Sequence, residues 1–560
     1  MTSGIKGVLI SDFSINNLAG YLSNNSIEQP VKCFIAPFNQ VHHTLIDANL
    51  ECWKHQSDFA VVWTLPERIL KNFAALLNYE NFDFADLKKE VEEFTSLIIN
   101  ASSRVKLTFV ATWSIDTTQQ NYGILTTKPD TGIINVLAQI NLLLAEKFWD
   151  QPNIYLLDSN KWNMRASNNA YNPKLWYLNK TPFNNMVFAD AAKDIMSSIK
   201  SIQGKNKKLI IVDLDNTLWG GIVGDIGYEN IKLGGHDPEG EAYKDFQFAL
   251  KMLKNKGVLL AIVSKNEERV ALLAIEKKSE MVLVKKDFVS WRINWEDKAK
   301  NIVELANELN LGLDSIVFID DNAHEREWVK SALPEIFVPE MPSDPLLYRQ
   351  FLLNLDCFNN FISTKEDKYR TKLYAEEKQR TENIKTISNL EEWLKSIDIK
   401  ITIEKTNEGN FQRVLQLLNK TNQLNLQTRR FTERELITWI SSDENSMFAF
   451  SVTDKFGDAG LTGIIGVTCK DGQATITDFV LSCRVIGRKA EEIMLYAAIE
   501  HAKNKFCKIV NATFIATEKN KPCYDFFKRS GFIEKENNFT WDASKTYAIP
   551  SYVTLILKEY

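Results

Sequence analysis

The stretch Lys-Lys-Leu-Ile-Ile-Val-Asp-Leu-Asp-Asn-Thr-Leu-Trp-Gly-Gly, residues 207–221, decides the fold of the middle of this chain. Its apolar run from Leu209 to Val212 is short and has no polar alternation, which predicts a parallel strand buried on both faces. Asp213 and Asp215 follow at the carboxyl end of that strand, the edge of an α/β sheet where ligands bind. As alternate residues, the two carboxylates point the same way.

Two adjacent carboxylates repel each other and are costly to bury unless a proton or a cation lies between them. Because the candidate ligands are all oxygen atoms, the ion that we expect is Mg²⁺. The alternative is that Asp213 and Asp215 belong to an acidic turn that closes the strand, since such residues are common in turns. The residues that follow favour the metal site.

Polar residues recur at the ends of the next predicted elements. Val258–Val263 predicts a second strand that ends at Ser264, whose hydroxyl can hold a phosphoryl oxygen. Lys298 begins a predicted helix, and a strand at 315–319 ends in an acidic pair that starts with Asp320. The order Asp-x-Asp-x-Thr, Ser, Lys, Asp-Asp resembles the haloacid dehalogenase (HAD) superfamily of phosphatases and phosphotransferases, which use an aspartate nucleophile.

The resemblance implies a role for each of these residues. Asp213 would attack the phosphoryl group and become an aspartyl phosphate, while Lys298 and Mg²⁺ neutralise charge. Asp215 would protonate the leaving oxygen and then take a proton from the incoming water or acceptor. Metal ligation would fall to the carboxylate of Asp213, the backbone carbonyl of Asp215 and Asp320, with Asp321 as a candidate for an outer position.

Length and composition describe an ordinary globular protein. The chain has 560 residues, 44% of them hydrophobic and 25% charged, for which we expect about three domains. A net charge of -5 and a pI near 5.9 argue against nucleic-acid binding. We find no signal peptide, no membrane-spanning run and no CxxC spacing among the seven cysteines, and we expect a cytoplasmic protein with reduced thiols.

Residues 1–200 predict a parallel sheet flanked by helices. The expected strands are 5–10, 31–36, 59–63, 105–113 and 153–157. This arrangement resembles a degenerate SGNH-hydrolase (Rossmann-like) domain with Ser11 in the nucleophile loop. Such a hydrolase needs a late histidine, but His42, His43 and His55 all lie early. We therefore expect a scaffold or docking domain in which Ser11 is not catalytic.

Residues 201–355 are expected to form the HAD-like catalytic domain, followed by a charged helical connector at 356–396. The glycine-rich stretch from Gly220 to Gly240 either closes over a substrate or simply leads into a helix predicted at 243–254. It is too short for a large cap domain, so the site should be open unless another domain or a partner covers it. An open site suits a substrate that is carried on a protein.

Residues 397–560 predict a third α/β domain. We expect antiparallel strands at 448–453, 461–468 and 475–481, then a basic loop and a helix at 490–503. This order resembles the GNAT acetyltransferase fold, in which amides at the helix N-terminus hold the pyrophosphate of coenzyme A.

The basic loop matches the GNAT pattern in part. Arg484, Gly487 and Arg488 fit it, but Lys489 stands where Gly or Ala is usual. A phosphopantetheine arm is therefore as good a guest for this loop as acetyl-CoA.

All three parts together resemble the FkbH-like family, HAD subfamily IIIC. The supporting motifs lie at 213–221, 264–266, 292–298, 318–322, 421–430 and 482–488. The resemblance implies dephosphorylation of 1,3-bisphosphoglycerate and passage of its glyceryl group, as a thioester, to an acyl carrier protein for polyketide or related biosynthesis.

One position departs from that family, because Val263 stands where a cysteine often precedes Ser-Lys-Asn. The remaining candidate for an acyl-carrying thiol is Cys483, whose basic neighbours and helix N-terminus would lower its pKa. The alternative is that Cys483 is a small buried hydrophobic residue.

A segment rich in amides and guanidiniums precedes the three strands of the third domain. Asn422, Gln423 and Asn425 could bond the amides of a pantetheine arm, and Arg429 and Arg430 could bind a phosphate or carboxylate. The alternative is a loop that packs two domains together.

Three functions stay open at this point. The first is a HAD-type phosphatase and glyceryl transferase that loads a carrier protein, and the second is a phosphatase of a small sugar or metabolite phosphate. The third is a non-catalytic assembly protein. The complete set Asp213, Asp215, Ser264, Lys298 and Asp320 argues against the third, because a scaffold has no use for so many unpaired charges.

Overall fold

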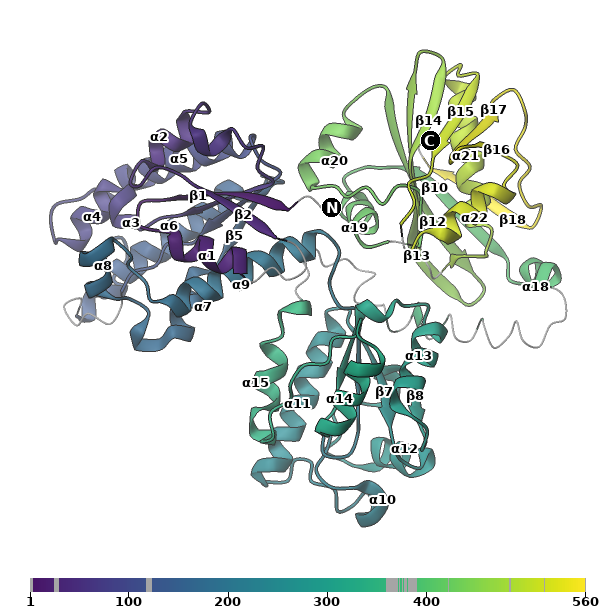
Figure 1. Cartoon of the computed structure of the whole chain (residues 1–560), viewed down its shortest axis with the longest axis horizontal. Helices are drawn as coiled ribbons and strands as arrows, with labels where there is room; N and C mark the ends of the chain where they lie inside the picture. Colours follow the sequence, from purple (N-terminus) through teal and green to yellow (C-terminus); the bar gives the residue numbers. More distant parts are fainter. Residues whose placement is uncertain are drawn as a thin grey trace. The chain divides into compact units, whose positions relative to one another are not determined.

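The computed structural model covers the whole chain. It describes residues 4–24, 30–116, 123–358, 371, 373–374, 376, 380, 390–421, 423–482, 485–517 and 519–558. The chain forms two compact units, Met1–Ile199 with Phe431–Thr438, and Lys200–Arg430 with Trp439–Tyr560. Three sheets lie within them, which confirms the mixed α/β class (Figure 1). The predicted division into three domains and a connector stays a prediction, since most of 356–396 lies outside the described residues.

The first unit contains a five-stranded sheet with the order β2-β1-β3-β4-β5, in which all neighbours are parallel. Each predicted strand is present within two residues of its expected ends. The strands are β1 Ile5–Ser11, β2 Val31–Ile35, β3 Phe59–Trp63, β4 Leu107–Ala111 and β5 Ile154–Leu157. Helices pack around them (Figure 1): α1 Asn16–Asn24, α2 Val41–Ile46, α3 Pro66–Ile69, α4 Lys71–Leu77, α5 Phe84–Ser102, α6 Ile133–Phe148, α7 Ser159–Ala166, α8 Pro173–Asn179 and α9 Asn185–Ile202.

The second unit begins with a four-stranded parallel sheet of order β8-β7-β6-β9. Its strands are β6 Leu209–Val212, β7 Leu259–Ser264, β8 Phe288–Ile293 and β9 Ile316–Ile319. Its helices are α10 Val223–Ile226, α11 Pro238–Asn255, α12 Glu268–Lys277, α13 Lys298–Glu308, α14 Ala323–Ala332 and α15 Tyr348–Leu353. Three of the strands were expected, and β8 was not.

Strand β6 is buried on both faces, as its apolar run predicts. Ile210 and Val212 belong to a core that α11, α12 and α15 complete, whereas Leu209 and Ile211 belong to a second core beneath α13 and α14. All four side chains are 0% exposed. A polar residue in this run would be buried without a partner, so the first carboxylate comes directly after the strand.

The glycine-rich stretch after β6 is partly tied to itself. Gly220 N donates to Lys232 O at 3.0 Å, and Lys232 N donates to Gly220 O at 2.9 Å. Short helix α10 lies between these two residues, and α11 follows. The stretch is therefore an ordered turn whose base is closed by two backbone hydrogen bonds.

The third sheet has nine strands in the order β16-β17-β15-β14-β13-β12-β10-β18, with β11 paired to β14. The three predicted strands and the predicted helix are present, and the other strands were not expected. The strands are β10 Ile399–Lys405, β11 Leu424–Asn425, β12 Asn445–Asp454, β13 Gly457–Lys470, β14 Gln473–Leu481, β15 Ile509–Thr513, β16 Ile533–Lys535, β17 Asn538–Asp542 and β18 Val553–Lys558. The helices are α18 Leu390–Ser396, α19 Phe411–Lys420, α20 Glu433–Ile440, α21 Ala490–Asn504 and α22 Lys521–Arg529.

Strand β11 lies between β14 and β15, which diverge along their length. These two strands pair in parallel only over Gln473–Ile476 and Ile509–Ala512. Farther along, Leu426 N donates to Phe479 O and Ile515 N donates to Leu426 O, each at 3.1 Å. The segment that starts with β11 is thus bonded to β14 on one side and to the residues that follow β15 on the other.

None of the helices in the described part of the chain is both long enough and apolar enough to cross a bilayer.

Candidate active site

The polar residues predicted for the site meet at one edge of the four-stranded sheet. Asp213 follows β6, Ser264 is the last residue of β7, and Asp320 follows β9. Because β6 pairs in parallel with both β7 and β9, the three carboxyl ends lie side by side. The strand arrangement therefore brings together residues that are more than one hundred positions apart.

Lys298 joins them from the first turn of α13. Asp297 caps this helix, accepting a bond from Lys300 N at 2.9 Å. The Nζ atom of Lys298 lies 3.1 Å from Oδ2 of Asp213 and 2.6 Å from Oδ2 of Asp320. Burial by itself lowers the pKa of Lys298, but the two carboxylates outweigh burial and raise that pKa. The ammonium is therefore charged.

Three carboxylates form a group that suits a metal ion. Asp213, Asp320 and Asp321 each offer an oxygen within 4.8 Å of the others. Within the described residues, the buried Oδ1 atom of Asp213 has no hydrogen-bond partner. Burial raises the pKa of both Asp320 and Asp321, and the charge of Asp213 raises both further. A divalent cation with oxygen ligands relieves these costs, so the residues present fit Mg²⁺.

Asp321 lies closer to this group than the sequence analysis placed it. Its carboxylate is one of the three, and Oδ1 also accepts a bond from Thr217 Oγ1 at 3.2 Å. The hydroxyl comes from the Asp-x-Asp-x-Thr motif, so the motif helps to orient a candidate ligand.

The side chain of Asp215 lies outside this group and is held by three donors. Oδ1 accepts bonds from Trp219 Nε1 at 2.9 Å and Val223 N at 3.0 Å, and Oδ2 accepts one from Asn266 Nδ2 at 2.8 Å. Burial raises the pKa of Asp215, although these three bonds oppose the increase. Its backbone carbonyl as a metal ligand stays a prediction.

Ser264 and Val263 are adjacent but lie in different surroundings. Ser264 is 2% exposed, and its carbonyl accepts a bond from Asn294 N at 3.1 Å. Val263 is 0% exposed and packs in the core beneath α13 and α14 with Ile211 and Ile302. A side chain at 263 therefore faces the core.

Two residues of the site, Trp219 and Asn266, were not predicted from the sequence. They lie in the motifs at 213–221 and 264–266, yet an indole and an amide give no direct sign of a role. The available signal was their position, since both follow strands that carry predicted site residues.

Three of the residues predicted to bind a cofactor or to react in the third domain cannot be described. Asn422, Cys483 and Arg484 lie outside the described residues. Gly487 is described and has a φ of 84°, which suits its lack of a side chain.

Arg488 is buried rather than displayed at a loop surface. It is 3% exposed, and its Nη1 atom lies 3.1 Å from Oδ2 of Asp454. Arg380 binds the same carboxylate through two bonds of 2.8 Å. The predicted cofactor contact of Arg488 stays a prediction.

The described amide and guanidinium side chains of the amide-rich segment have hydrogen-bond partners within the protein, and Gln423 Nε2 donates to Asn310 Oδ1, beyond the end of α13, at 3.1 Å. Gln423 is half-buried and directly precedes β11. Asn425 is 2% exposed, donates to Thr421 O at 2.9 Å and accepts from Thr428 N at 2.7 Å. Arg429 pairs with the buried Asp478. Both alternatives for this segment, a pantetheine site and a loop that packs two domains together, stay predictions.

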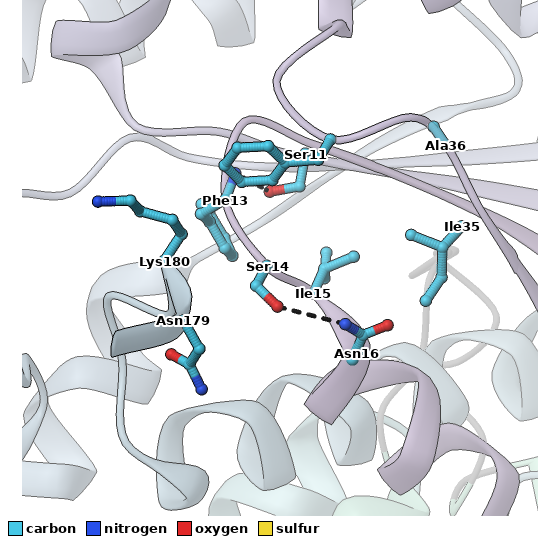
Figure 2. A pocket seen from close by; sticks show the side chains of 10 residues that line it. Ser11, Phe13, Ser14, Ile15, Asn16, Ile35, Ala36, Asn179 and Lys180 are labelled. Atoms are coloured by element: carbon cyan, nitrogen blue, oxygen red, sulfur yellow. Dashed lines mark hydrogen bonds between the residues drawn. The ribbon is translucent and has the colours of Figure 1, made fainter. Parts of the chain in front are cut away.

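A cavity of about 350 Å³ lies at the carboxyl ends of β1 and β2 in the first unit (Figure 2). Ser11 Oγ accepts a bond from Phe13 N at 3.1 Å, and within the described residues it has no bond to a histidine or carboxylate. A serine hydrolase needs a base bonded to this oxygen, and the prediction that Ser11 is not catalytic stays a prediction. The cavity is lined by Ser11, Phe13, Ser14, Ile15, Asn16, Ile35, Ala36, Phe38, Asn179 and Lys180.

A family model and a solved structure are similar to parts of this chain. Residues 8–200 match the family model of the FkbH N-terminal domain. The structure is similar to the N-terminal part of a Bacteroides fragilis protein that contains a phosphatase domain and was solved in complex with Mg. That match has 28% identity and a TM-score of 0.58, and it covers 64% of this chain and 94% of the other.

Two acetyltransferases match a smaller share. The ribosomal-protein-S18-alanine N-acetyltransferase of Escherichia coli has 9% identity and a TM-score of 0.22, covering 26% of this chain and 96% of its own. The PaiA N-acetyltransferase of Thermoplasma acidophilum, in complex with coenzyme A, has 12% identity and a TM-score of 0.20, covering 25% and 96%. No curated protein matches the sequence. The chain is thus similar to the FkbH N-terminal domain over residues 8–200 and, over 64% of its length, to a Mg-bound structure that contains a phosphatase domain.

Proposed function

We propose that this chain is a Mg²⁺-dependent phosphatase or phosphotransferase of the HAD type with Asp213 as its nucleophile. The observation that carries the proposal is the buried group at the sheet edge, where Lys298 binds Asp213 and Asp320 while Oδ1 of Asp213 has no partner among the described residues. The likeness to a Mg-bound phosphatase structure supports it.

Each residue of this group has a defined part in the reaction. A metal ion held by Asp213, Asp320 and Asp321 would neutralise charge on the phosphoryl group. The ammonium of Lys298 binds one phosphoryl oxygen, and the hydroxyl of Ser264 donates to another.

The reaction then proceeds in two displacements. A carboxylate oxygen of Asp213 attacks phosphorus, its bond to phosphorus forms as the bond to the leaving oxygen breaks, and Asp215 gives that oxygen its proton. In the second step water attacks the phosphorus of the aspartyl phosphate and gives a proton to Asp215. The bond between phosphorus and Asp213 breaks, which releases phosphate and restores both carboxyl groups.

We further propose 1,3-bisphosphoglycerate as the substrate and an acyl carrier protein as the acceptor of the glyceryl group. The motif resemblance and the FkbH N-terminal domain match over residues 8–200 support this choice. The displacement by Asp213 would remove the phosphate ester at C3. Acyl transfer would use a thiol other than position 263, with Cys483 as the candidate: its thiolate would attack the C1 carbonyl and release the C1 phosphate, and the thiol of the carrier would then take the glyceryl group and restore the Cys483 thiol. The carrier would bring the phosphopantetheine arm, and the reaction would take place in the cytoplasm.

The second candidate is a phosphatase of a small sugar or metabolite phosphate without acyl transfer. One observation favours it: Val263 is buried in the core, so the position where the family often has cysteine has neither a thiol nor access to the sheet edge.

One experiment tests the proposal and separates its two forms. The purified protein is incubated with Mg²⁺ and either bisphosphoglycerate or sugar phosphates, with a panel of carrier proteins present. Phosphate release is measured and each carrier is weighed by mass spectrometry. A glyceryl mass on a carrier supports the first form, and phosphate release without it supports the second.

Asp213→Asn is the decisive variant, and Asp245→Asn is its matched control because Asp245 is exposed on α11. Asp213→Asn should abolish phosphate release, whereas Asp245→Asn should keep it. Normal turnover by Asp213→Asn would rule out Asp213 as the nucleophile.

A further inference from the structure

We propose that Trp219 and Asn266 are positioning residues that fix the carboxyl plane of Asp215, so that its Oδ2 atom is the one that faces the substrate. This inference rests on the proposed function, because it concerns the group that exchanges a proton with the leaving oxygen. It adds two residues to the site and assigns each of the two oxygens of Asp215 a different task.

The argument starts from the number of bonds that a carboxylate can accept. Its two oxygens offer about four lone-pair positions, two on each atom. Oδ1 of Asp215 receives both Trp219 Nε1 and Val223 N, at 2.9 and 3.0 Å, and is therefore fully used. Oδ2 receives Asn266 Nδ2 at 2.8 Å. With these bonds intact, the one position left for a proton or a leaving oxygen is on Oδ2.

The donors come from rigid parts of the structure. Trp219 is 0% exposed and belongs to the core that also contains Tyr243. Asn266 is 4% exposed and follows the end of β7. Neither side chain can turn away without opening packed structure, so the carboxyl plane they hold is fixed before a substrate binds.

The loop that carries Asp215 and Trp219 is held in the same way. Asn216 has a φ of 55°, and its Oδ1 atom accepts a bond from Gly221 N at 2.9 Å. The hydroxyls of Tyr243 and Tyr348 donate to Asn216 O at 3.4 and 3.3 Å. Gln247 donates to Leu218 O at 2.9 Å. The turn therefore presents one orientation of the Asp215 carboxyl.

The consequence is a dependence on the leaving group. An alkyl phosphate ester releases an alkoxide, which needs a proton as it departs, whereas p-nitrophenolate departs without one. A well-placed general acid contributes about 10²–10⁴-fold to a rate. Losing a donor to Asp215 should therefore slow alkyl esters more than p-nitrophenyl phosphate.

The test compares Trp219→Phe and Asn266→Ala with the wild-type chain on two substrates, β-glycerol phosphate and p-nitrophenyl phosphate, in the presence of Mg²⁺. Trp219→Phe keeps most of the aromatic volume but removes the N–H, and Asn266→Ala removes the amide. We compare kcat/KM, which reports the first displacement and not the later attack of water that both substrates share. We expect kcat/KM on the alkyl ester to fall by about 10-fold or more and kcat/KM on the aryl ester to fall by about 3-fold or less. Inhibition by orthovanadate should be unchanged, because Asp213 and Lys298 are intact.

Trp162→Phe is the matched control. The indole of Trp162 is 1% exposed and donates to Asp194 Oδ2 at 2.8 Å in the first unit, so this variant also loses a buried bond between tryptophan and aspartate. It should leave both rates unchanged.

The outcomes separate this inference from the proposed function. If both variants slow the two esters equally, or slow neither, Trp219 and Asn266 are structural residues and the inference is wrong. If Trp219→Phe fails to fold, the ratio measured for Asn266→Ala decides. If the wild-type chain with Mg²⁺ releases phosphate from neither ester and from neither bisphosphoglycerate nor sugar phosphates, the proposed function fails, and the inference falls with it.

Discussion

The Nζ atom of Lys298 lies 2.6 Å from Oδ2 of Asp320, and both side chains are buried. Asp213 shares the same ammonium, and Asp321 completes the acidic group. When all are ionised, three carboxylates and one ammonium leave two negative charges. A divalent cation neutralises that charge, so the composition of the group itself favours an ion such as Mg²⁺ over a monovalent one.

Replacing Lys298 with methionine should make stability depend on the metal. The change leaves two buried carboxylates without their cation, which costs about 3–5 kcal/mol when one partner of a buried pair is removed. Urea unfolding should show this loss in EDTA and a smaller loss in Mg²⁺. Lys300→Met is the control, since Lys300 is exposed and pairs with the exposed Glu296. Equal losses in EDTA and Mg²⁺ would contradict the prediction.

Asp321→Asn should weaken metal binding. Its carboxylate lies within the acidic group and is oriented by Thr217. Because loss of an outer partner of a ligand already costs about 10–100-fold in metal affinity, loss of a ligand carboxylate should cost at least that much. Calorimetric titration with MgCl₂ measures the change directly, and phosphate release should stop in EDTA and return with Mg²⁺. An affinity equal to that of Asp245→Asn would show that Asp321 is not involved.

Two glycines after the motif should respond differently to alanine. Gly221 has a φ of 97°, and an added Cβ would lie 2.6 Å from Cδ1 of Ile226. Gly224 has nothing closer than 3.9 Å. We expect Gly221→Ala to cost about 1–3 kcal/mol in the free energy of unfolding and Gly224→Ala to cost little or to stabilise helix α10. Unfolding curves of the two variants, measured together, check this contrast.

Stability of the first unit should depend on the ionisation of Asp12. Burial raises the pKa of Asp12 from 3.8 to about 7, although Leu65 N and Arg68 oppose the increase. Since the folded chain prefers the protonated form, this contribution is fully present below about pH 3.8 and is lost as the pH rises towards 7. Asp12→Asn, which has no charge to bury, should therefore be more stable than the wild type at pH 7.5.

The same comparison at pH 4 is the control, because Asp12 is then protonated in the folded chain. The difference in unfolding free energy between the two proteins should nearly vanish there. A constant difference from pH 4 to pH 7.5 would show that Asp12 does not titrate in this range.

Local patterns predicted the strands and the residues at their ends. The run before Asp213 has a single interpretation because both faces of β6 are buried, so every position is apolar. Strand β8 was missed because it mixes polar and apolar residues. Ser290 donates to Glu308 at 2.8 Å, and Arg292 pairs with Glu304 and Glu308. These partners lie on α13, and the strand itself contains no sign of them.

The partners of individual polar groups were harder to predict than the elements. Arg488 was expected to face a ligand, but its partner Asp454 lies 34 residues earlier and is buried with it. Asp215 and Asn266 are 51 residues apart and meet because β6 pairs with β7. Such pairs depend on strand order, which a linear pattern does not specify.

Strand β11 and Leu426 already occupy backbone hydrogen bonds of β14 and of the residues that follow β15, so a second peptide could pair there only by replacing them. Leu426 bonds to Phe479 in β14 and to Ile515, which lies just beyond β15, and Asn520 adds another bond to Asn425 O at 3.0 Å. A guest chain would have to displace these contacts, each worth about 0.5–1.5 kcal/mol, before making its own. Because β11 belongs to the same chain, it competes intramolecularly with any peptide for these hydrogen bonds, and a peptide that binds weakly would not displace it.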